Sequence, residues 1–343
     1  MSYKVLLTSV GGELAPYVIN HLKNKTRHEI YLVGVDMSKF ALGKDFCDKF
    51  YEVPPGNNKN FAEKIKEIVL NEKINLVIPA SDEEALSLSY SKDEFSKISC
   101  NIASINYKDL EVLSDKYKTY NLLAKNNIHV PFYLLARNKN ELIQAIDRIK
   151  IRDSKFVIKP TKSRGSRGVY IISEDQKELK ECAKNNREKN SSLINFLDKE
   201  IDSLEKLYPV VVMEFLQNPI VDMDILSWNS RLISVVLRRR VNPMRPNDGH
   251  EIFFDKNLES LAKKIVKIFK LSWLYDCDIM FDREGNPCLL ELNPRQSGSL
   301  AVSLEAGYHL LDDLISLSKG ENIKTKSHKY LGKVIPYKSL KAI

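Results

Sequence analysis

The run LLELNPRQSGS, residues 289–299, places an acid, an amide and an arginine at the end of an apolar stretch. Glu291 and Asn293 offer oxygen donors, and Arg295 follows as a cation. Hard oxygen donors suit Mg²⁺ or Mn²⁺, which bind a few protein carboxylates together with water and nucleotide phosphates. An arginine beside them suits a phosphoryl oxygen or a charged intermediate. A metal and an arginine together indicate phosphate chemistry.

A turn-forming quartet, REGN, separates this run from the strand-like YDCDIMF. The simplest hairpin register pairs Asp282 with Pro287 and places Asp278 opposite Glu291. Acids that face one another across a ladder are mildly destabilising unless a cation lies between them. The side chains that project from one face are Asp276, Asp278, Glu291 and Asn293, with Asp276 opposite Asn293. Oxygen donors arranged in this way suit a divalent metal ion; a solvated hairpin face is the alternative.

A polyphosphate needs cations, and the segment around Lys159 supplies them. Lys159 ends the run FVIK, where its ammonium can reach phosphate oxygens. The loop TKSRGSRGV follows, and Gly165, Ser166 and Gly168 in it favour close backbone approach to phosphates. The loop is not a P-loop, since GxxxxGK[ST] does not occur. A flexible basic loop without a ligand is the alternative.

The run VVVMEFLQNPIVDMD is typical of a hinge that holds a nucleotide base. Glu214 and the backbone of Phe215 and Leu216 offer donors and acceptors for an adenine edge, and Asp222 can accept from ribose hydroxyls. The alternative for Glu214 is an acid that happens to follow a buried strand.

Candidate substrate residues lie on RLISVVLRRR and in the loop NDGHEIFF. Arg238 and Arg240 fall on one face of a strand, where they can bind an acidic substrate or the γ-phosphate; a solvated basic edge is the alternative. We predict that His250 is a surface histidine, with a position near the site as the alternative.

The elements that position these residues follow two patterns. The first hundred residues alternate apolar runs with helical patterns, which predicts βαβ units and a parallel sheet. The first turn of this region resembles a dinucleotide-binding turn, with Gly11 and Gly12 followed by Asp36 at the end of the next strand. The GxGxxG spacing is missing, so we favour an ordinary turn at the point where the strand order reverses. The remainder predicts an α+β fold with a meander at 221–240 and a closing helix at about 300–318.

In order, these motifs resemble the ATP-grasp superfamily, and most closely its carbamoyl-phosphate-synthase-like and biotin-carboxylase-like branch. The matching runs are SDKYKT, VIKP, SRGSRGV, MEFL and LLELNPR. The resemblance implies an N-terminal Rossmann-like pre-ATP-grasp domain at 1–112, a two-lobed ATP-grasp domain at 113–320 with a lid at about 130–210, and a C-terminal tail at 321–343.

The resemblance also implies roles for individual residues. Lys116 and Lys159 would contact ATP phosphates, and Arg295 would stabilise the phosphorylated intermediate. Ser297 and Gly298 would lie near the acceptor. Glu214 and Leu216 would hold adenine, Asp222 would meet the ribose, and Asp278, Glu291 and Asn293 would hold Mg²⁺ or Mn²⁺. Two departures are Asp278, where Glu or Gln is common, and a loop with fewer glycines and more arginines than in biotin carboxylases.

The reaction that the resemblance implies is ATP-dependent carboxylate–amine ligation through an acylphosphate, which releases ADP and phosphate. The alternatives are a small-molecule kinase and a nucleotide-binding module without chemistry. We expect small-molecule carboxylate and amine substrates and a homodimer.

Composition bounds the class of protein. The net charge of +8 is spread over the 343 residues rather than clustered, which favours a phosphate-bearing ligand over nucleic acid. The five cysteines are scattered without CxxC spacing, so neither a disulfide framework nor a zinc site is predicted. The sequence has neither a signal-peptide pattern nor 18 consecutive apolar residues, so we expect a cytoplasmic protein without a membrane span.

Overall fold

The computed structural model describes residues 2–163, 167–175, 188–323 and 330–337. The chain forms two compact units. Unit 1 comprises Met1–Glu111, Val221–Asp278 and Leu292–Ile343, and unit 2 comprises Val112–Ile220 and Ile279–Glu291. Among the described residues, every helix is too short or too polar to cross a lipid bilayer.

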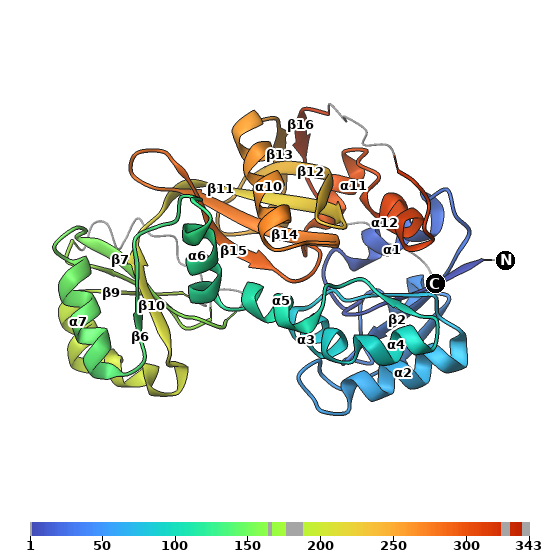
Figure 1. Cartoon of the computed structure of the whole chain (residues 1–343), viewed down its shortest axis with the longest axis horizontal. Helices are drawn as coiled ribbons and strands as arrows, with labels where there is room; N and C mark the ends of the chain where they lie inside the picture. The colour runs from blue at the N-terminus through green and yellow to red at the C-terminus, as the bar shows by residue number, and fades with distance from the viewer. Residues whose placement is uncertain (1, 164–166, 176–187, 324–329, 338–343) are drawn as a thin grey trace. The chain divides into compact units, whose positions relative to one another are not determined.

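Unit 1 begins with a parallel sheet of strand order β3-β2-β1-β4-β5. Its strands are β1 (Tyr3–Leu7), β2 (Ile30–Asp36), β3 (Lys49–Glu52), β4 (Leu76–Ile78) and β5 (Asn101–Ile102). The accompanying helices are α1 (Ala15–Asn24), η1 (Lys44–Phe46), α2 (Phe61–Glu72), α3 (Asp82–Tyr90), α4 (Lys92–Lys97) and α5 (Tyr107–Leu113). Apolar residues of α2, α3 and α4 pack against one face of the sheet (Figure 1). The predicted βαβ rhythm is confirmed.

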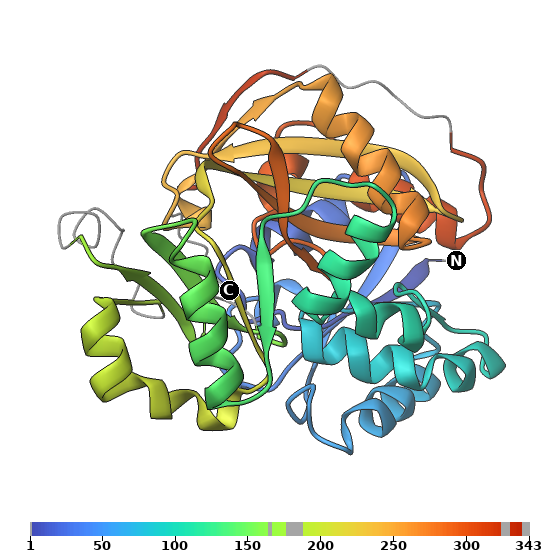
Figure 2. The same ribbon diagram turned by 60° about the vertical axis from the view of Figure 1, so that its left-hand side comes forward.

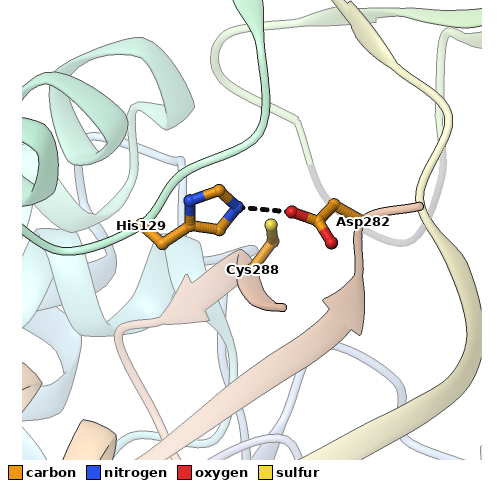
Figure 3. A group of neighbouring side chains, drawn as sticks. All are labelled: His129, Asp282 and Cys288. Carbon is orange, nitrogen blue, oxygen red and sulfur yellow. Dashed lines mark hydrogen bonds and ion pairs between the residues drawn. The ribbon is translucent and has the colours of Figure 1, made fainter. Parts of the chain in front are cut away.

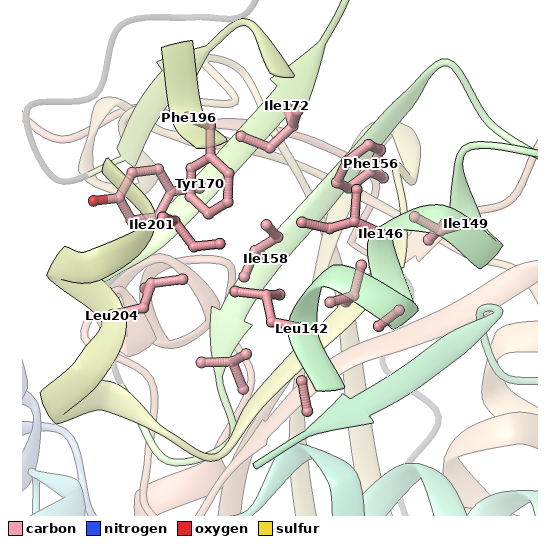
Figure 4. Packing of buried hydrophobic residues seen from close by; sticks show 14 of the residues in the cluster. Leu142, Ile146, Ile149, Phe156, Ile158, Tyr170, Ile172, Phe196, Ile201 and Leu204 are labelled. Atoms are coloured by element: carbon pink, nitrogen blue, oxygen red, sulfur yellow. The ribbon is translucent and has the colours of Figure 1, made fainter. Parts of the chain in front are cut away.

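Unit 2 is built on a sheet of order β6-β10-β7-β8-β9, in which only the β8–β9 pair is parallel. Its elements are α6 (Lys116–Lys125), β6 (Tyr133–Ala136), α7 (Lys139–Ile149), β7 (Lys155–Pro160), β8 (Val169–Ser173), β9 (Glu188–Ser191), α9 (Leu193–Asn195), η2 (Phe196–Glu200), η3 (Ile201–Leu207) and β10 (Val210–Glu214). Helix α7 and the segment 193–207 cover one face of this sheet (Figure 2). Leu142 and Ile146 of α7 meet Phe156, Ile158 and Leu204 in its core (Figure 4).

The third sheet has the order β15-β14-β11-β12-β13-β16, and most of it lies in unit 1. Its strands are β11 (Gln217–Trp228), β12 (Arg231–Arg240), β13 (His250–Phe253), β14 (Trp273–Phe281), β15 (Pro287–Asn293) and β16 (Gly332–Val334). The helices of this region are η4 (Pro246–Asp248), α10 (Lys256–Ile268), α11 (Leu300–Glu305) and α12 (Leu310–Ser318). The predicted meander is confirmed as the antiparallel pair β11–β12.

Three expectations are corrected. The single closing helix is wrong: α11 and α12 are separate, and Gly307 between them has φ +85°. The loop expected around His250 forms strand β13, which pairs with β12 and β16. The Asp282–Pro287 register is wrong, because Asp282 N donates to Asn286 O at 3.0 Å.

The hairpin turn itself explains the change of register. Gly285 N donates to Asp282 O at 3.2 Å, and Gly285 has φ +81°. A type I turn followed by a left-handed residue gives a three-residue loop with a bulge, and only glycine adopts that conformation freely. Further along, Asp276 N donates to Arg295 O at 3.0 Å, so Asp276 does not pair with the Asn293 backbone as expected.

Candidate functional site

Two lysines and one carboxylate converge in unit 2. Lys116 begins α6, where the N-cap residue Asp115 accepts a hydrogen bond from Lys118 N at 3.1 Å. Lys116 Nζ donates to Ser163 O at 2.7 Å and lies 3.5 Å from Glu291 Oε2. The helix start therefore fixes one cation beside the acid of LLELNPR.

Lys159 supplies the second cation of this group. It lies near the end of β7, is 3% exposed, and its Nζ donates to Tyr120 Oη at 3.0 Å. Burial, reinforced by the positive charge of Lys116 and opposed by Glu291, lowers the pKa of Lys159 to about 7. The nearby carboxylates of Glu291 and Glu188 do not offset burial and the charge of Lys116, so a bound anion would stabilise the charged form of Lys159.

The Glu214 side chain makes a specific backbone contact at the hinge. Its Oε1 accepts from Phe132 N at 2.6 Å, which ties β10 to the segment before β6. Burial raises the pKa of Glu214. Next to it, Lys155 Nζ lies 3.8 Å from the centre of the Phe215 ring, and Leu216 is buried. The predicted contacts with adenine through Glu214, Phe215 and Leu216 stay predictions.

The glycine loop is described in part. Gly168 has φ +73°, and a Cβ there would lie 3.0 Å from both Pro160 Cγ and Leu207 Cδ1, so glycine is required. Gly165 and Ser166 lie outside the described residues, and their predicted phosphate contacts are untested.

Asp222, Arg240 and Asp278 form a charged chain in unit 1. Arg240 Nε donates to Asp222 at 2.9 Å, and Arg240 Nη2 donates to Asp278 Oδ2 at 3.0 Å. His250 Nε2 lies 2.6 Å from Asp222 Oδ2. Burial opposes ionisation of Asp222, but the hydrogen bonds from His250 and the charge of Arg240 outweigh it and hold the pKa of that carboxyl well below its usual range.

The expectation of a surface His250 is wrong, since the residue is 0% exposed. Strand β13 pairs with β12 on one side and with β16 on the other, and the His250 imidazole forms a hydrogen bond with Asp222. Burial lowers the pKa of His250.

A second group in unit 1 surrounds Asp276. Asn293 Nδ2 donates to Asp276 Oδ2 at 3.0 Å and Arg295 Nη1 donates to the same oxygen at 2.8 Å. Arg295 Nε lies 3.0 Å from Asp82 Oδ1 at the start of α3. Asp276 Oδ1 is buried and has no hydrogen-bond partner among the described residues. An orphaned buried carboxylate oxygen fits a site that accepts a cation.

The candidate substrate residues are buried. Arg238 is 0% exposed; its Nη2 donates to Asp224 Oδ1 at 3.0 Å and its Nη1 donates to Ser299 Oγ at 2.7 Å. Burial, opposed by Arg238, raises the pKa of Asp224 to about 6. Ser297 Oγ lies 3.0 Å from Ser299 Oγ, and Gly298 has open space around its Cα.

The structure therefore groups the predicted residues in three sets, one in unit 2 and two in unit 1. Lys116, Lys159 and Glu291 meet in unit 2. Asp278 meets Asp222 and Arg240 in unit 1, and Asn293 and Arg295 meet at Asp276. Whether Asp278 and Glu291 share a metal stays a prediction.

Sequence reasoning missed the partners that hold these groups. Asp82 had a readable signal, because it opens a helix directly after a parallel strand, where sites gather in α/β sheets. Tyr120 and Asp224 had none, because a lone tyrosine on a helix and an acid on an apolar strand are ordinary core positions.

Three family models match successive parts of the chain. The model described as "PylC-like, N-terminal domain" matches residues 5–103, "Sugar-transfer associated ATP-grasp" matches 101–221, and "ATP-grasp in the biosynthetic pathway with Ter operon" matches 206–341. A related protein is the coenzyme gamma-F420-2:alpha-L-glutamate ligase of Methanocaldococcus jannaschii, 26% identical over 214 residues that cover 62% of this chain and 69% of that protein.

Solved structures show the same fold. N5-carboxyaminoimidazole synthetase from Staphylococcus aureus superposes with a TM-score of 0.67 at 15% identity, covering 95% of this chain and 80% of that one. The biotin carboxylase domain dimer of Hydrogenobacter thermophilus 2-oxoglutarate carboxylase, in complex with MgADP, ADP and bicarbonate, gives 0.69 at 15% identity, covering 97% and 73%. Two ATP-grasp family models together match residues 101–341, so this chain is similar to the ATP-grasp superfamily over most of its length, and it shares its fold with the synthetase and the biotin carboxylase domain.

Proposed function

We propose that this protein is an ATP-dependent carboxylate–amine ligase that works through an acylphosphate. The observation that carries the proposal is the placement of Lys116 and the buried Lys159 close together, with Glu291 beside Lys116. Two neighbouring ammonium groups suit a polyphosphate, which carries several negative charges. The glutamate ligase that this chain resembles supports an amino acid as one of the two substrates.

The residues of the chain fit Mg²⁺. Asp278, Asn293 and Glu291 would hold it, and the unpartnered Oδ1 of Asp276 adds an acid to the same neighbourhood in unit 1. Bound Mg²⁺ neutralises and aligns the β- and γ-phosphates. Arg240 Nη2 lies 3.0 Å from Asp278 Oδ2. Asp278 is shorter than the Glu or Gln common at this position, which would alter metal preference.

The remaining nucleotide contacts follow the family pattern. Glu214 and the backbone of Phe215 and Leu216 would hold adenine, and Asp222 would meet the ribose. Asp222 already accepts from Arg240 and His250, so a ribose hydroxyl would join that network. The loop residues that would cover the phosphates are Gly165, Ser166 and Gly168.

The chemistry balances with two substrates and ATP. A carboxylate oxygen of the first substrate attacks the γ-phosphorus, and the bond to ADP breaks. The amine of the second substrate then attacks the acyl carbon, loses a proton, and phosphate leaves. Arg295 would compensate charge on the transferring group, as a fixed cation held by Asp276 and Asp82. A lid at about 130–210 would exclude water from the acylphosphate.

The substrates would lie among Arg238, Arg240, Ser297 and Gly298. Arg238 contributes by fixing the Ser299 segment, whereas Arg240 is partly exposed and suits an anionic group. We also propose a cytoplasmic homodimer that acts on small molecules, with domains at 1–112 and 113–320 and a tail at 321–343.

The test is ADP release with amino and sugar acids that raise the melting temperature in the presence of ATP and Mg²⁺. Ligation requires both a carboxylate and an amine for sustained ADP release, and hydroxylamine in place of the amine should give a hydroxamate. Lys116→Gln should reduce ADP release at least tenfold, while Lys118→Gln, an exposed position two residues along the same helix, should not. ADP release without an amine, with a stable phosphorylated product, would contradict ligation and indicate a kinase.

A further inference from the structure

Three metal-binding side chain types meet in unit 2, and none of the three residues has a role in the proposed reaction. His129 lies between α6 and β6, Asp282 follows β14, and Cys288 lies in β15 (Figure 3). One ligand atom from each of the three lies within 4.8 Å of the other two. His129 Nε2 and Asp282 Oδ2 are 2.7 Å apart. The residues are 153 and 6 positions apart in sequence, which explains why spacing gave no zinc prediction.

The donor set has a clear chemical preference. Imidazole nitrogen, carboxylate oxygen and thiolate sulfur together suit Zn²⁺ and similar borderline ions, whereas Mg²⁺ prefers oxygen alone. In a tetrahedral zinc site with bonds of about 2.0–2.3 Å, ligand atoms lie about 3.5 Å apart. Separations of up to 4.8 Å would close by about 1.3 Å at most, and the 2.7 Å between His129 Nε2 and Asp282 Oδ2 would open by about 0.8 Å. The half-exposed His129 side chain can provide both movements.

Two of the ligands are already held in place. Asp282 Oδ1 accepts from Asn286 N at 2.7 Å and Oδ2 accepts from Asn286 Nδ2 at 2.9 Å, so the hairpin turn orients the carboxylate. These hydrogen bonds and His129 outweigh burial and lower the pKa of Asp282. Cys288 is 0% exposed. A fixed acid and thiol with one solvent-facing histidine give both a preformed site and an entry path.

A cavity of about 480 Å³ adds an independent observation. His129 and Asp282 both line it, together with the carboxylates of Glu214 and Glu284 and the guanidinium of Arg152. The opening leaves room for water or a further ligand in a fourth position, as in zinc sites that keep an open coordination place.

We propose that His129, Asp282 and Cys288 bind one borderline transition-metal ion, such as Zn²⁺, at a site separate from the Mg²⁺ site. Cys288 and Glu291 are three residues apart on β15. The ion would join the segment before β6 to the β14–β15 hairpin. This site does not depend on the proposed ligase reaction.

Binding must displace a proton. Burial, with added charge from Asp282 and Glu214, raises the pKa of the Cys288 thiol to about 12. The metal–sulfur bond therefore forms as the S–H bond breaks, and the proton goes to the buffer. The imidazole hydrogen now pointing at Asp282 moves to Nδ1 by exchange with water. With one net proton released, affinity should rise about tenfold per pH unit near neutrality.

Cobalt titration tests the site directly. Protein stripped with a chelator and kept in excess Mg²⁺ should bind one Co²⁺ with a thiolate-to-metal absorption band and release about one proton. Cys288→Ser should abolish the band, and His129→Gln should weaken binding at least about tenfold. Cys100→Ser is the matched control, since Cys100 is also buried with a pKa raised to about 12.

The outcomes separate the metal site from a plain ion pair. If His129 and Asp282 serve only to fasten the hairpin, the wild-type protein will show no thiolate band with Co²⁺, and the proposal is overturned. A band that survives in Cys288→Ser, or disappears in Cys100→Ser, overturns it equally. Because His129 is half exposed, His129→Gln keeps the fold, and circular dichroism of each variant verifies this.

Discussion

Replacing Lys159 by methionine should have opposite effects on folding and on nucleotide binding. Lys159 is 3% exposed and lies beside Lys116, so its positive charge destabilises the folded protein when no phosphate is bound. Methionine has a similar length and no charge. The variant should therefore be more stable than the wild type without nucleotide, and it should lose most of its stabilisation by ATP and Mg²⁺.

The magnitude follows from the pKa. The fall from 10.5 to about 7 corresponds to about 5 kcal/mol, since one pH unit is worth about 1.4 kcal/mol. The unfolded chain keeps the proton up to pH 10.5, whereas the folded protein loses it above pH 7, so wild-type stability rises with pH between these values. The gain from Lys159→Met should then be about 5 kcal/mol at pH 6 and about 2 kcal/mol at pH 9.

Urea unfolding followed by circular dichroism at pH 6 and pH 9 measures this difference. Lys155→Met is the control, because Lys155 lies on the same strand, partly exposed, over the Phe215 ring. It should show no gain that depends on pH. A Lys159→Met protein that gains no stability at pH 6, gains equally at pH 9, or is stabilised by ATP as strongly as the wild type would refute the reasoning.

Other predictions concern the acids, the arginines and the turn. Arg240→Leu leaves two buried carboxylates without their cation and should cost about 3 kcal/mol in urea unfolding followed by tryptophan fluorescence. Arg239→Leu, 43% exposed on the same strand, should cost less than about 0.5 kcal/mol. Glu291→Ala should lower ADP release about a hundredfold; unchanged turnover would remove Glu291 from the site, and Glu284→Ala is its control. Gly285→Ala, at φ +81°, should lower thermal stability by about 1 kcal/mol, and no loss would contradict the bulge.

The sequence was most informative where a feature depends on the alternation of side chains along a strand or on residues that are close in sequence. Alternation along 273–293 placed Asp276 and Asn293 on one face, and their side chains do form a hydrogen bond. The parallel sheet followed from local rules in the same way. These features depend on neighbours along the chain or on one turn.

Features set by distant partners were not predictable. His250 follows a glycine in a polar loop, and only pairing with β12 and β16 makes it a buried strand residue. Arg238 has the sequence pattern of a solvated edge, yet Asp224 and Ser299 make its burial possible. The bulge at Gly285 changes the hairpin register by one residue, which no hydrophobic pattern encodes.

Unit 2 is not one continuous stretch of chain, and this limits how it can be dissected. Val112–Ile220 carries both lysines of the cation group, but Ile279–Glu291 carries the acid between them. A fragment that stops at Ile220 would keep two neighbouring ammonium groups without their counter-charge, and it would also lack Asp282 and Cys288. Excision of this unit for study would need a designed linker from 220 to 279 rather than a simple truncation.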